Sequence, residues 1–228
     1  MIVRSGLIRK KADWSGEDFR RYWREHHGAL AARLPGLRRY EQNHVVDSVQ
    51  RGIAYTRGPE QLDGFSMLWF DSEDAMRAAI ATEAGRALVA DEDHFIGDLR
   101  IVALDQVEVI PPAAGRPLLK RMSLLRRLPE VSPERFKHEW REEHARLVKR
   151  LSGVRGYRQN LIVHREAPKG TVVGYEGLAV DGIVELWFDD AVSLDAAFAT
   201  PQGVTLMTHA REFIGEITTF LVETHVVV

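Results

Sequence analysis

The sequence predicts an α+β fold in which two ferredoxin-like repeats, each βαββαβ, pack their antiparallel sheets into one barrel within a single chain. Three observations support this prediction. The second half of the chain repeats the first, and both halves show the same order of strand and helix signals. In such a unit the helices cover only one face of the sheet. The other face needs a cover, and we expect the second sheet to provide it.

The internal repeat is clearest around the first helix of each half. When residues 14–46 are aligned with residues 131–163, sixteen of the 33 positions are identical. After a one-residue insertion the match resumes, with Leu68-Trp69-Phe70-Asp71 opposite Leu186-Trp187-Phe188-Asp189. The sequence therefore predicts a first repeat over residues 1–110, a proline-rich linker over 111–117 and a second repeat over 118–228.

The elements follow in the same order in both repeats. A strand comes first, and the helix after it begins at Ser15 or at Ser132-Pro133. Serine caps free backbone N–H groups, and proline suits the first helical position. Gly36 and Gly153 end this helix, because a left-handed residue is usual there. The expected strands of the first repeat are 3–9, 37–46, 65–70 and 100–110, and residues 72–95 are expected to form a broken helix. In the second repeat, 119–127 is the expected first strand and 218–228 the expected last strand.

The third strand and the overall composition limit the class of protein. Residues 65–70 are apolar on both faces, which is typical of a sheet covered on both sides. The chain has 45% hydrophobic and 28% charged residues and a formal charge of −2, so it shows no electrostatic footprint for nucleic acid or an anionic membrane. It lacks cysteine, a long apolar run and a recognisable signal peptide. We expect a cytoplasmic protein.

The helix and second strand of each repeat share a pattern of residues. The first copy reads Phe19-x3-Trp23-x3-His27-x2-Leu30-x5-Gly36-Leu37-Arg38-x-Tyr40-x-Gln42-Asn43, and the second reads Phe136-x3-Trp140-x3-His144-x2-Leu147-x5-Gly153-Val154-Arg155-x-Tyr157-x-Gln159-Asn160. This pattern resembles the EthD family of dimeric α+β barrels, and the two copies cover nearly the whole chain. The family commonly has one such domain and dimerises, whereas here two are fused.

The resemblance implies a small cavity in each repeat, between the sheet and the helices or inside the barrel. It also implies cofactor-free chemistry on small oxygenated compounds, as in related lactone isomerases, cyclases, dehydratases and decarboxylases. Many members of the family have no assigned activity, so the resemblance leaves the reaction open.

The expected catalytic residues are His27 and Tyr40, with His144 and Tyr157 as their equivalents. Each histidine lies on the buried stripe of its helix, where an imidazole is suited to general acid–base catalysis near neutral pH. Each tyrosine lies on the facing strand and would polarise a carbonyl or hydroxyl group. The alternative is a core histidine bonded to a backbone carbonyl and a tyrosine that fills core space.

Further side chains are expected to bind the substrate. Tryptophans would form flat walls, arginines would bind a carboxylate, and glutamines would donate hydrogen bonds; core packing and ion pairs at the rim of the sheet are the alternatives. The candidates are Trp23, Arg38, Gln42, Trp69, His94, Trp140, Arg155, Gln159, Glu185 and Trp187.

The histidines show no spacing typical of a metal site. His26 and His27 point about 100° apart on a helix, so both cannot easily face one ion. A pairing of His27 with His44 or His94 across the fold remains an alternative. We expect no metal, no cofactor and no nucleotide, because the chain also lacks a glycine-rich phosphate loop.

We therefore expect a cofactor-independent lyase or isomerase that acts on a small cyclic, oxygenated metabolite by histidine and tyrosine acid–base chemistry. The alternative is a non-catalytic protein that binds a small hydrophobic ligand. The long connections 47–64 and 164–182 are expected to be either lids over the cavities or surface hairpins. The expected partner is a small molecule, and further homodimerisation stays open.

Overall fold

The computed structural model describes residues 1–228 and contains a closed barrel of eight strands, all paired antiparallel. Repeat 1 consists of β1 (Ile2–Lys10), α1 (Gly16–Tyr22), the π-helix η1 (Trp23–His27), α2 (Gly28–Ala31), β2 (Arg39–Asp47), β3 (Gly64–Phe70), α3 (Glu73–Ile80), α4 (Glu83–Phe95) and β4 (Ile96–Ile110). Repeat 2 consists of β5 (Leu119–Arg127), α5 (Pro133–Glu139), the π-helix η2 (Trp140–His144), α6 (Ala145–Val148), β6 (Gly156–Glu166), the 3-10 helix η3 (Tyr175–Gly177), β7 (Gly182–Phe188), α7 (Ala191–Ala199), α8 (Pro201–Ala210) and β8 (Ile214–Val226).

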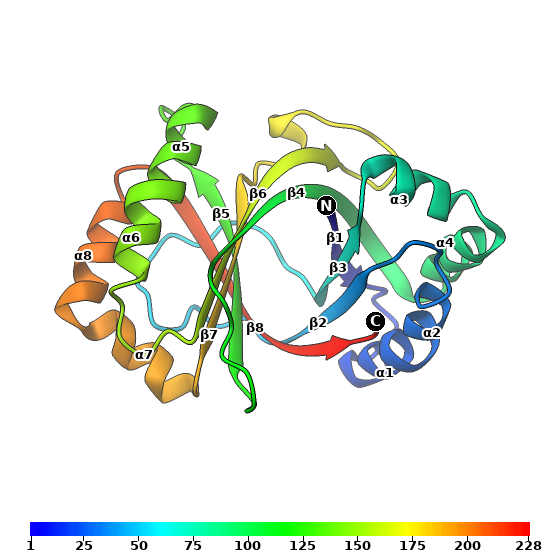
Figure 1. Ribbon diagram of the computed structural model, residues 1–228, viewed down its shortest axis with the longest axis horizontal. Coiled ribbons are helices and arrows are strands. Elements are labelled where there is room, and N and C mark those ends of the chain that lie inside the picture. Colours follow the sequence, from blue (N-terminus) through cyan, green and yellow to red (C-terminus); the bar gives the residue numbers. More distant parts are fainter.

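The strand order of the barrel is β1-β3-β2-β8-β5-β7-β6-β4. Each repeat forms a four-stranded sheet, and the two sheets are joined at two seams, where β2 pairs with β8 and β4 pairs with β6. The helices of the two repeats lie outside the barrel on opposite flanks (Figure 1). The predicted fold class is confirmed, and the barrel closes within one chain. No helix is long and apolar enough to cross a membrane.

Local sequence signals explain where the first helices begin and end. Ser15 and Ser132 accept hydrogen bonds from the backbone N–H groups of Asp18 and Arg135, as N-caps do. Gly36 has φ = 73° and Gly153 has φ = 86°, which is the left-handed conformation expected where the chain leaves a helix. The single predicted helix is in fact three pieces, because a five-residue π-helix interrupts it in each repeat.

Apolar residues fill two kinds of space, the barrel interior and the layers between the sheets and the helices. A cluster that includes Val3, Phe65, Met122 and Phe220 fills the barrel and draws on both repeats. Separate clusters fill the layers between each sheet and its own helices. Each sheet is therefore buried on both faces, which is why the third strand has apolar residues on both faces.

The two long connections cross to the opposite repeat. Residues 48–63 lie against repeat 2, where Tyr55 donates a hydrogen bond to the carbonyl of Ile214 at 2.7 Å and Ile53 joins the core of that repeat. Residues 167–181 reach back to repeat 1, where the N–H of Lys169 bonds the carbonyl of Leu99 at 2.8 Å. In Figure 1 the first connection is the cyan loop beside β5 and β8. Each repeat thus supplies a cover for the other.

Candidate functional site

The π-helix η1 places two candidate side chains on the sheet of repeat 1. Its first carbonyl, that of Trp23, accepts a hydrogen bond from the N–H of Gly28 and another from the Gln42 amide at 2.7 Å. The ring of Trp23 packs over Gly64 on β3, where any Cβ atom would collide with it. Trp23 and His27 are both buried. A π-helix inside an α-helix often marks a functional site.

His27 is held by a carboxylate on α4. Its Nδ1 lies 2.8 Å from Oδ2 of Asp91, and the other oxygen of Asp91 accepts a hydrogen bond of 2.6 Å from the Tyr22 hydroxyl. An ionised carboxylate only accepts, so Nδ1 carries the proton and Nε2 of the neutral ring is left as a base. Burial lowers the pKa of His27, and the bond to Asp91 only partly offsets this effect. The ring is therefore neutral at pH 7.

Tyr40 is oriented as a hydrogen-bond donor. Its hydroxyl oxygen accepts from Nε1 of Trp23 at 3.0 Å and from the Gln42 amide at 3.3 Å. Both neighbours are donors, so the proton of the Tyr40 hydroxyl remains free for a third group. Burial raises the pKa of Tyr40 well above its usual range, which keeps this proton in place.

His27 and Tyr40 line the same cavity between the sheet and the helices. The enclosed part is about 20 Å³, roughly the room of one water molecule. A hollow of about 390 Å³ lies outside it and shares three lining residues with it, namely Glu92, Ile96 and Leu99. Glu92 also forms an ion pair with Lys169 of the crossing loop 167–181. The inner cavity is therefore next to open surface, and the loop lines the outer hollow and contacts a residue shared by both spaces.

Three residues of this site were absent from the sequence prediction. Asp91 is 64 positions from His27 and aligns with His209 in the second repeat, so no signal marks it. Arg4 and Glu92 both line the cavity. Arg4 does leave a signal, because an arginine stands at the same place in both first strands, as Arg4 and Arg121.

The equivalent site in repeat 2 is built differently. Nδ1 of His144 lies 3.3 Å from Nδ1 of His209, whose Nε2 is 3.3 Å from Glu139. Burial, with a smaller effect of His209, lowers the pKa of His144 to about 3. Tyr157 again accepts from the Gln159 amide, at 2.6 Å, and lines a cavity of about 40 Å³ with His144.

The cover over the repeat 2 cavity also differs. Ile53 and Tyr55 of the crossing loop 48–63 join the apolar core of repeat 2. The same loop bonds Ile214 through the Tyr55 hydroxyl and Ile217 through the Thr56 carbonyl, and these two residues align with Ile96 and Leu99 of the first repeat. The loop that crosses to repeat 2 thus contributes apolar residues, whereas the loop that crosses to repeat 1 contributes an ion pair and lines an open hollow.

Several predicted binding residues lie away from either cavity. Trp69, Trp187 and Glu185 project into the barrel, on the opposite face of the sheet from the histidines. Arg38 and Arg155 form ion pairs with Asp71 and Asp189 outside the cavities. Trp23 does line the inner cavity of repeat 1. Trp140, Gln42 and Gln159 line neither site cavity and instead support the π-helices and the tyrosines. His94 is exposed and packs against Trp14 and Tyr22.

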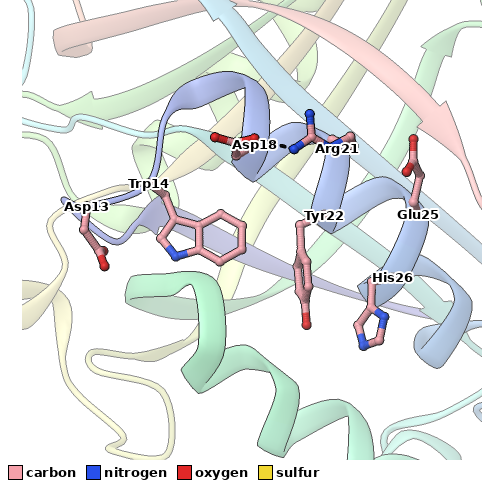
Figure 2. Close-up of a pocket in the computed structure, with 7 residues that line it drawn as sticks. All are labelled: Asp13, Trp14, Asp18, Arg21, Tyr22, Glu25 and His26. Carbon is pink, nitrogen blue, oxygen red and sulfur yellow. Dashed lines mark hydrogen bonds and ion pairs between the residues drawn. The ribbon is translucent and has the colours of Figure 1, made fainter.

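A second hollow, of about 470 Å³, lies beside the site on α1. It is lined by Asp13, Trp14, Asp18, Arg21, Tyr22, Glu25 and His26, and Figure 2 shows Tyr22 and His26 extending toward the neighbouring helix. Both of these side chains reach Asp91, since Nε2 of His26 is 3.4 Å from its Oδ1. Asp91 therefore joins the buried imidazole of His27 to groups at the surface.

The structure contains no cluster of three or more His, Asp and Glu side chains that could hold a metal ion. His44 does not approach His27 as a ligand pair would. Its ring packs on Trp23 with the ring centres 4.5 Å apart, and its Nε2 bonds the Gln42 amide oxygen at 3.2 Å.

Similar folds occur among solved structures. An anthrone oxidase-like protein has a TM-score of 0.65 and 11% identity, with 99% of this chain and 93% of that chain covered. Two proteins provisionally described as monooxygenases are also similar: one from Fusobacterium nucleatum (TM-score 0.64, 8% identity, 99% and 93% covered) and one from Lactobacillus acidophilus (0.60, 10%, 99% and 94%). At these identities the likeness shows the fold alone.

Sequence comparison identifies the family. No curated protein matches the chain. The family model for the EthD domain matches it twice, at residues 11–98 and at residues 128–216. Together these matches cover most of the sequence and fall on the two repeats, so the chain belongs to the EthD domain family.

Proposed function

We propose that the chain is a cofactor-independent enzyme of the lyase or isomerase type, and that it transfers protons on a small oxygenated metabolite in repeat 1. The observation that carries this proposal is the His27–Asp91 pair beside Tyr40 in one cavity. A neutral imidazole whose second nitrogen is bonded to a carboxylate has the arrangement of a general base.

In the proposed reaction, Nε2 of His27 removes a proton from a carbon next to a carbonyl group. The electron pair moves to the carbonyl oxygen, which accepts the free hydroxyl proton of Tyr40 as a hydrogen bond. Asp91 stabilises the imidazolium that forms. His27 then returns the proton to another carbon, which completes an isomerisation, or to a leaving group, which completes an elimination. Asp91 and Gln42 act as positioning residues.

Two features favour an enzyme over the alternative of a hydrophobic ligand carrier. A carrier is expected to have an apolar pocket with its histidines bonded to backbone carbonyls. The cavity of repeat 1 instead contains Arg4 and Glu92, and His27 is bonded to a carboxylate. Proteins of similar fold include ones provisionally described as monooxygenases and an anthrone oxidase-like protein, which supports a catalytic role without naming the reaction.

Deuterium exchange tests the proposal because it detects proton transfer at carbon whatever product is formed. Small lactones, cyclic ketones and keto acids would be incubated with the protein in D2O, and incorporation at carbon would be followed by NMR. We expect catalysed exchange in at least one compound class. His27→Gln should reduce the rate by about 100-fold or more, which is the contribution typical of a general base. A compound that binds but never exchanges would support the carrier instead, and an unchanged rate of catalysed exchange in His27→Gln would contradict the assignment of His27 as the base.

A further inference from the structure

Arg4 has an unusual environment within the repeat 1 site. It lies on β1 and lines the inner cavity together with His27, Tyr40 and Ser66. Its guanidinium is always charged, yet it takes part in none of the ion pairs or side-chain hydrogen bonds of the structure. Arg4 is half-buried, and even partial removal of such a charge from water is costly unless an opposite charge accompanies it. Arg4 therefore favours an anion in the cavity.

The nearby acids are engaged elsewhere. Glu92 and Glu166 are the carboxylates whose charges act on Arg4 most strongly. Glu92 is paired with Lys169, and Glu166 accepts a hydrogen bond of 2.7 Å from the N–H of Gly170. Both partners belong to the crossing loop 167–181, so each of these acids already has a partner of its own on this loop.

The equivalent arginine of repeat 2 provides an internal comparison. Arg121 stands at the same place in β5, and its Nη1 donates to the carbonyl of Arg51 at 3.1 Å. Its guanidinium also lies over the ring of Phe198, 4.5 Å from the ring centre. The crossing loop 48–63 thus provides one hydrogen-bond acceptor for Arg121, whose buried Nε has no partner, whereas the other loop provides no acceptor for Arg4.

We infer that Arg4 binds the carboxylate of the substrate, so that the substrates are small carboxylic acids with a second oxygenated carbon. The planar fork of a guanidinium matches a carboxylate in bidentate fashion. A carboxylate held there would take up the water-sized inner cavity, so that the neighbouring carbons of the ligand would lie where this cavity meets the outer hollow. The body of the ligand would extend into the outer hollow of about 390 Å³. The assignment of this ligand as a substrate rests on the proposed function, whereas anion binding at Arg4 does not.

The test is an NMR titration of the arginine Nε–Hε signals of the full chain with acetate and benzoate. Acetamide and benzamide serve as uncharged probes of the same shape. We expect the Arg4 signal, identified by its loss in Arg4→Lys, to shift and saturate with the acids but not with the amides. Binding to the variants is followed on the signals of benzoate itself, because Arg4→Met and Arg4→Lys lack the Arg4 signal. Arg4→Met should weaken acid binding about tenfold or more, the factor for one lost charge-assisted hydrogen bond. Arg121→Met is the matched control and should bind as the wild type does.

Two outcomes would overturn the inference. One is the absence of a saturable shift of the Arg4 signal with either acid. The other is equal loss of binding in Arg4→Met and Arg121→Met. The Arg4→Lys variant serves as a control for misfolding. It keeps a positive charge at this position but lacks the bidentate guanidinium, so it should bind the acids with an affinity between those of the wild type and Arg4→Met. Failure of the proposed function would look different: His27→Gln would keep both acid binding and deuterium exchange.

Discussion

At the scale of single residues, burial sets the protonation of the histidines. His27, His44 and His144 are all buried, and burial lowers the pKa of each below its usual value. Only His27 faces a carboxylate, which opposes the shift and keeps its pKa closer to neutrality. His27 is therefore the buried histidine best matched to proton transfer near pH 7.

The buried histidines predict acid sensitivity of the fold. Burial lowers the pKa of His44 to about 3, with smaller effects of His225, Arg24 and Arg20. Between this value and the unfolded pKa of about 6.5, the unfolded state binds more protons. The stabilisation is thus complete above pH 6.5 and falls as the pH falls toward 3, by up to about 1.4 kcal/mol per pH unit for one histidine.

Replacement of His44 by leucine, the residue at the equivalent position 161, should flatten this dependence. Urea unfolding at pH 7 and pH 5 measures the free energy of unfolding at both values. We expect His44→Leu to lose less stability on acidification than the wild type, by about 2 kcal/mol over this range. The exposed His138→Leu is the control and should behave as the wild type does. An unchanged slope in His44→Leu would contradict the assignment.

At the scale of elements, the contact between a π-helix and the third strand fixes each site. The rings of Trp23 and Trp140 lie against Gly64 and Gly182, the first residues of β3 and β7. An added methyl group at either glycine would collide with the indole. Helix and strand therefore approach closely only because these two positions have no side chain.

Alanine at these glycines should separate stability from activity. Gly64→Ala and Gly182→Ala are each expected to lower the free energy of unfolding by about 1–3 kcal/mol, the usual cost of overpacking. Only Gly64→Ala should also slow deuterium exchange, because it displaces the helix that carries His27. Gly174→Ala, where a Cβ atom would meet nothing within 4 Å, is the control. Equal slowing by both repeat variants would place the reaction elsewhere.

The sequence predicted these elements well and their relative faces less well. Capping residues and periodicity located the strands and helices, and spacing placed His27 and Tyr40 on facing elements, where they line one cavity. Periodicity could not assign Trp69 to the barrel interior, because β3 is buried on both faces and either face looks like core. The π-helix was also missed, since its Phe19–Trp23–His27 spacing fits an ordinary α-helix.

At the scale of the whole molecule, a buried polar network joins the two repeats inside the barrel. Nζ of Lys120 lies 2.7 Å from Glu185 and 2.8 Å from Asn43 of the other repeat. Burial opposes ionisation of Glu185, but the charges of Lys120 and Arg158 hold its pKa below the usual range. Repeat 1 has Val3 and Met67 at the positions of Lys120 and Glu185. The charged pair is therefore specific to one half.

A double-mutant cycle tests this network. Lys120→Val should cost about 3–5 kcal/mol, because it leaves Glu185 buried without its partner. Lys120→Val combined with Glu185→Met restores the apolar pair of repeat 1 and should recover much of that loss. Urea unfolding of the wild type, both single variants and the double variant gives the coupling energy. Additive losses would show that the pair is not coupled.

The duplication also explains why one cavity differs from the other. The crossing loops distinguish the two sites. Loop 48–63 adds the apolar side chains of Ile53 and Tyr55 to the core of repeat 2, whereas loop 167–181 supplies Lys169, which pairs with Glu92 in repeat 1. The sequence could not predict this exchange, because long polar loops carry no periodic signal that indicates where they pack. The cavity of repeat 1 is the one that combines a histidine bonded to a carboxylate with a neighbouring open hollow.

The most direct test of proton transfer in repeat 1 is the rate of deuterium exchange in His27→Gln beside His144→Gln, measured on the same compound under the same conditions. A reaction confined to repeat 1 predicts a loss of about 100-fold or more in His27→Gln and the wild-type rate in His144→Gln. Equal losses in both variants, or a loss confined to His144→Gln, would contradict proton transfer in repeat 1.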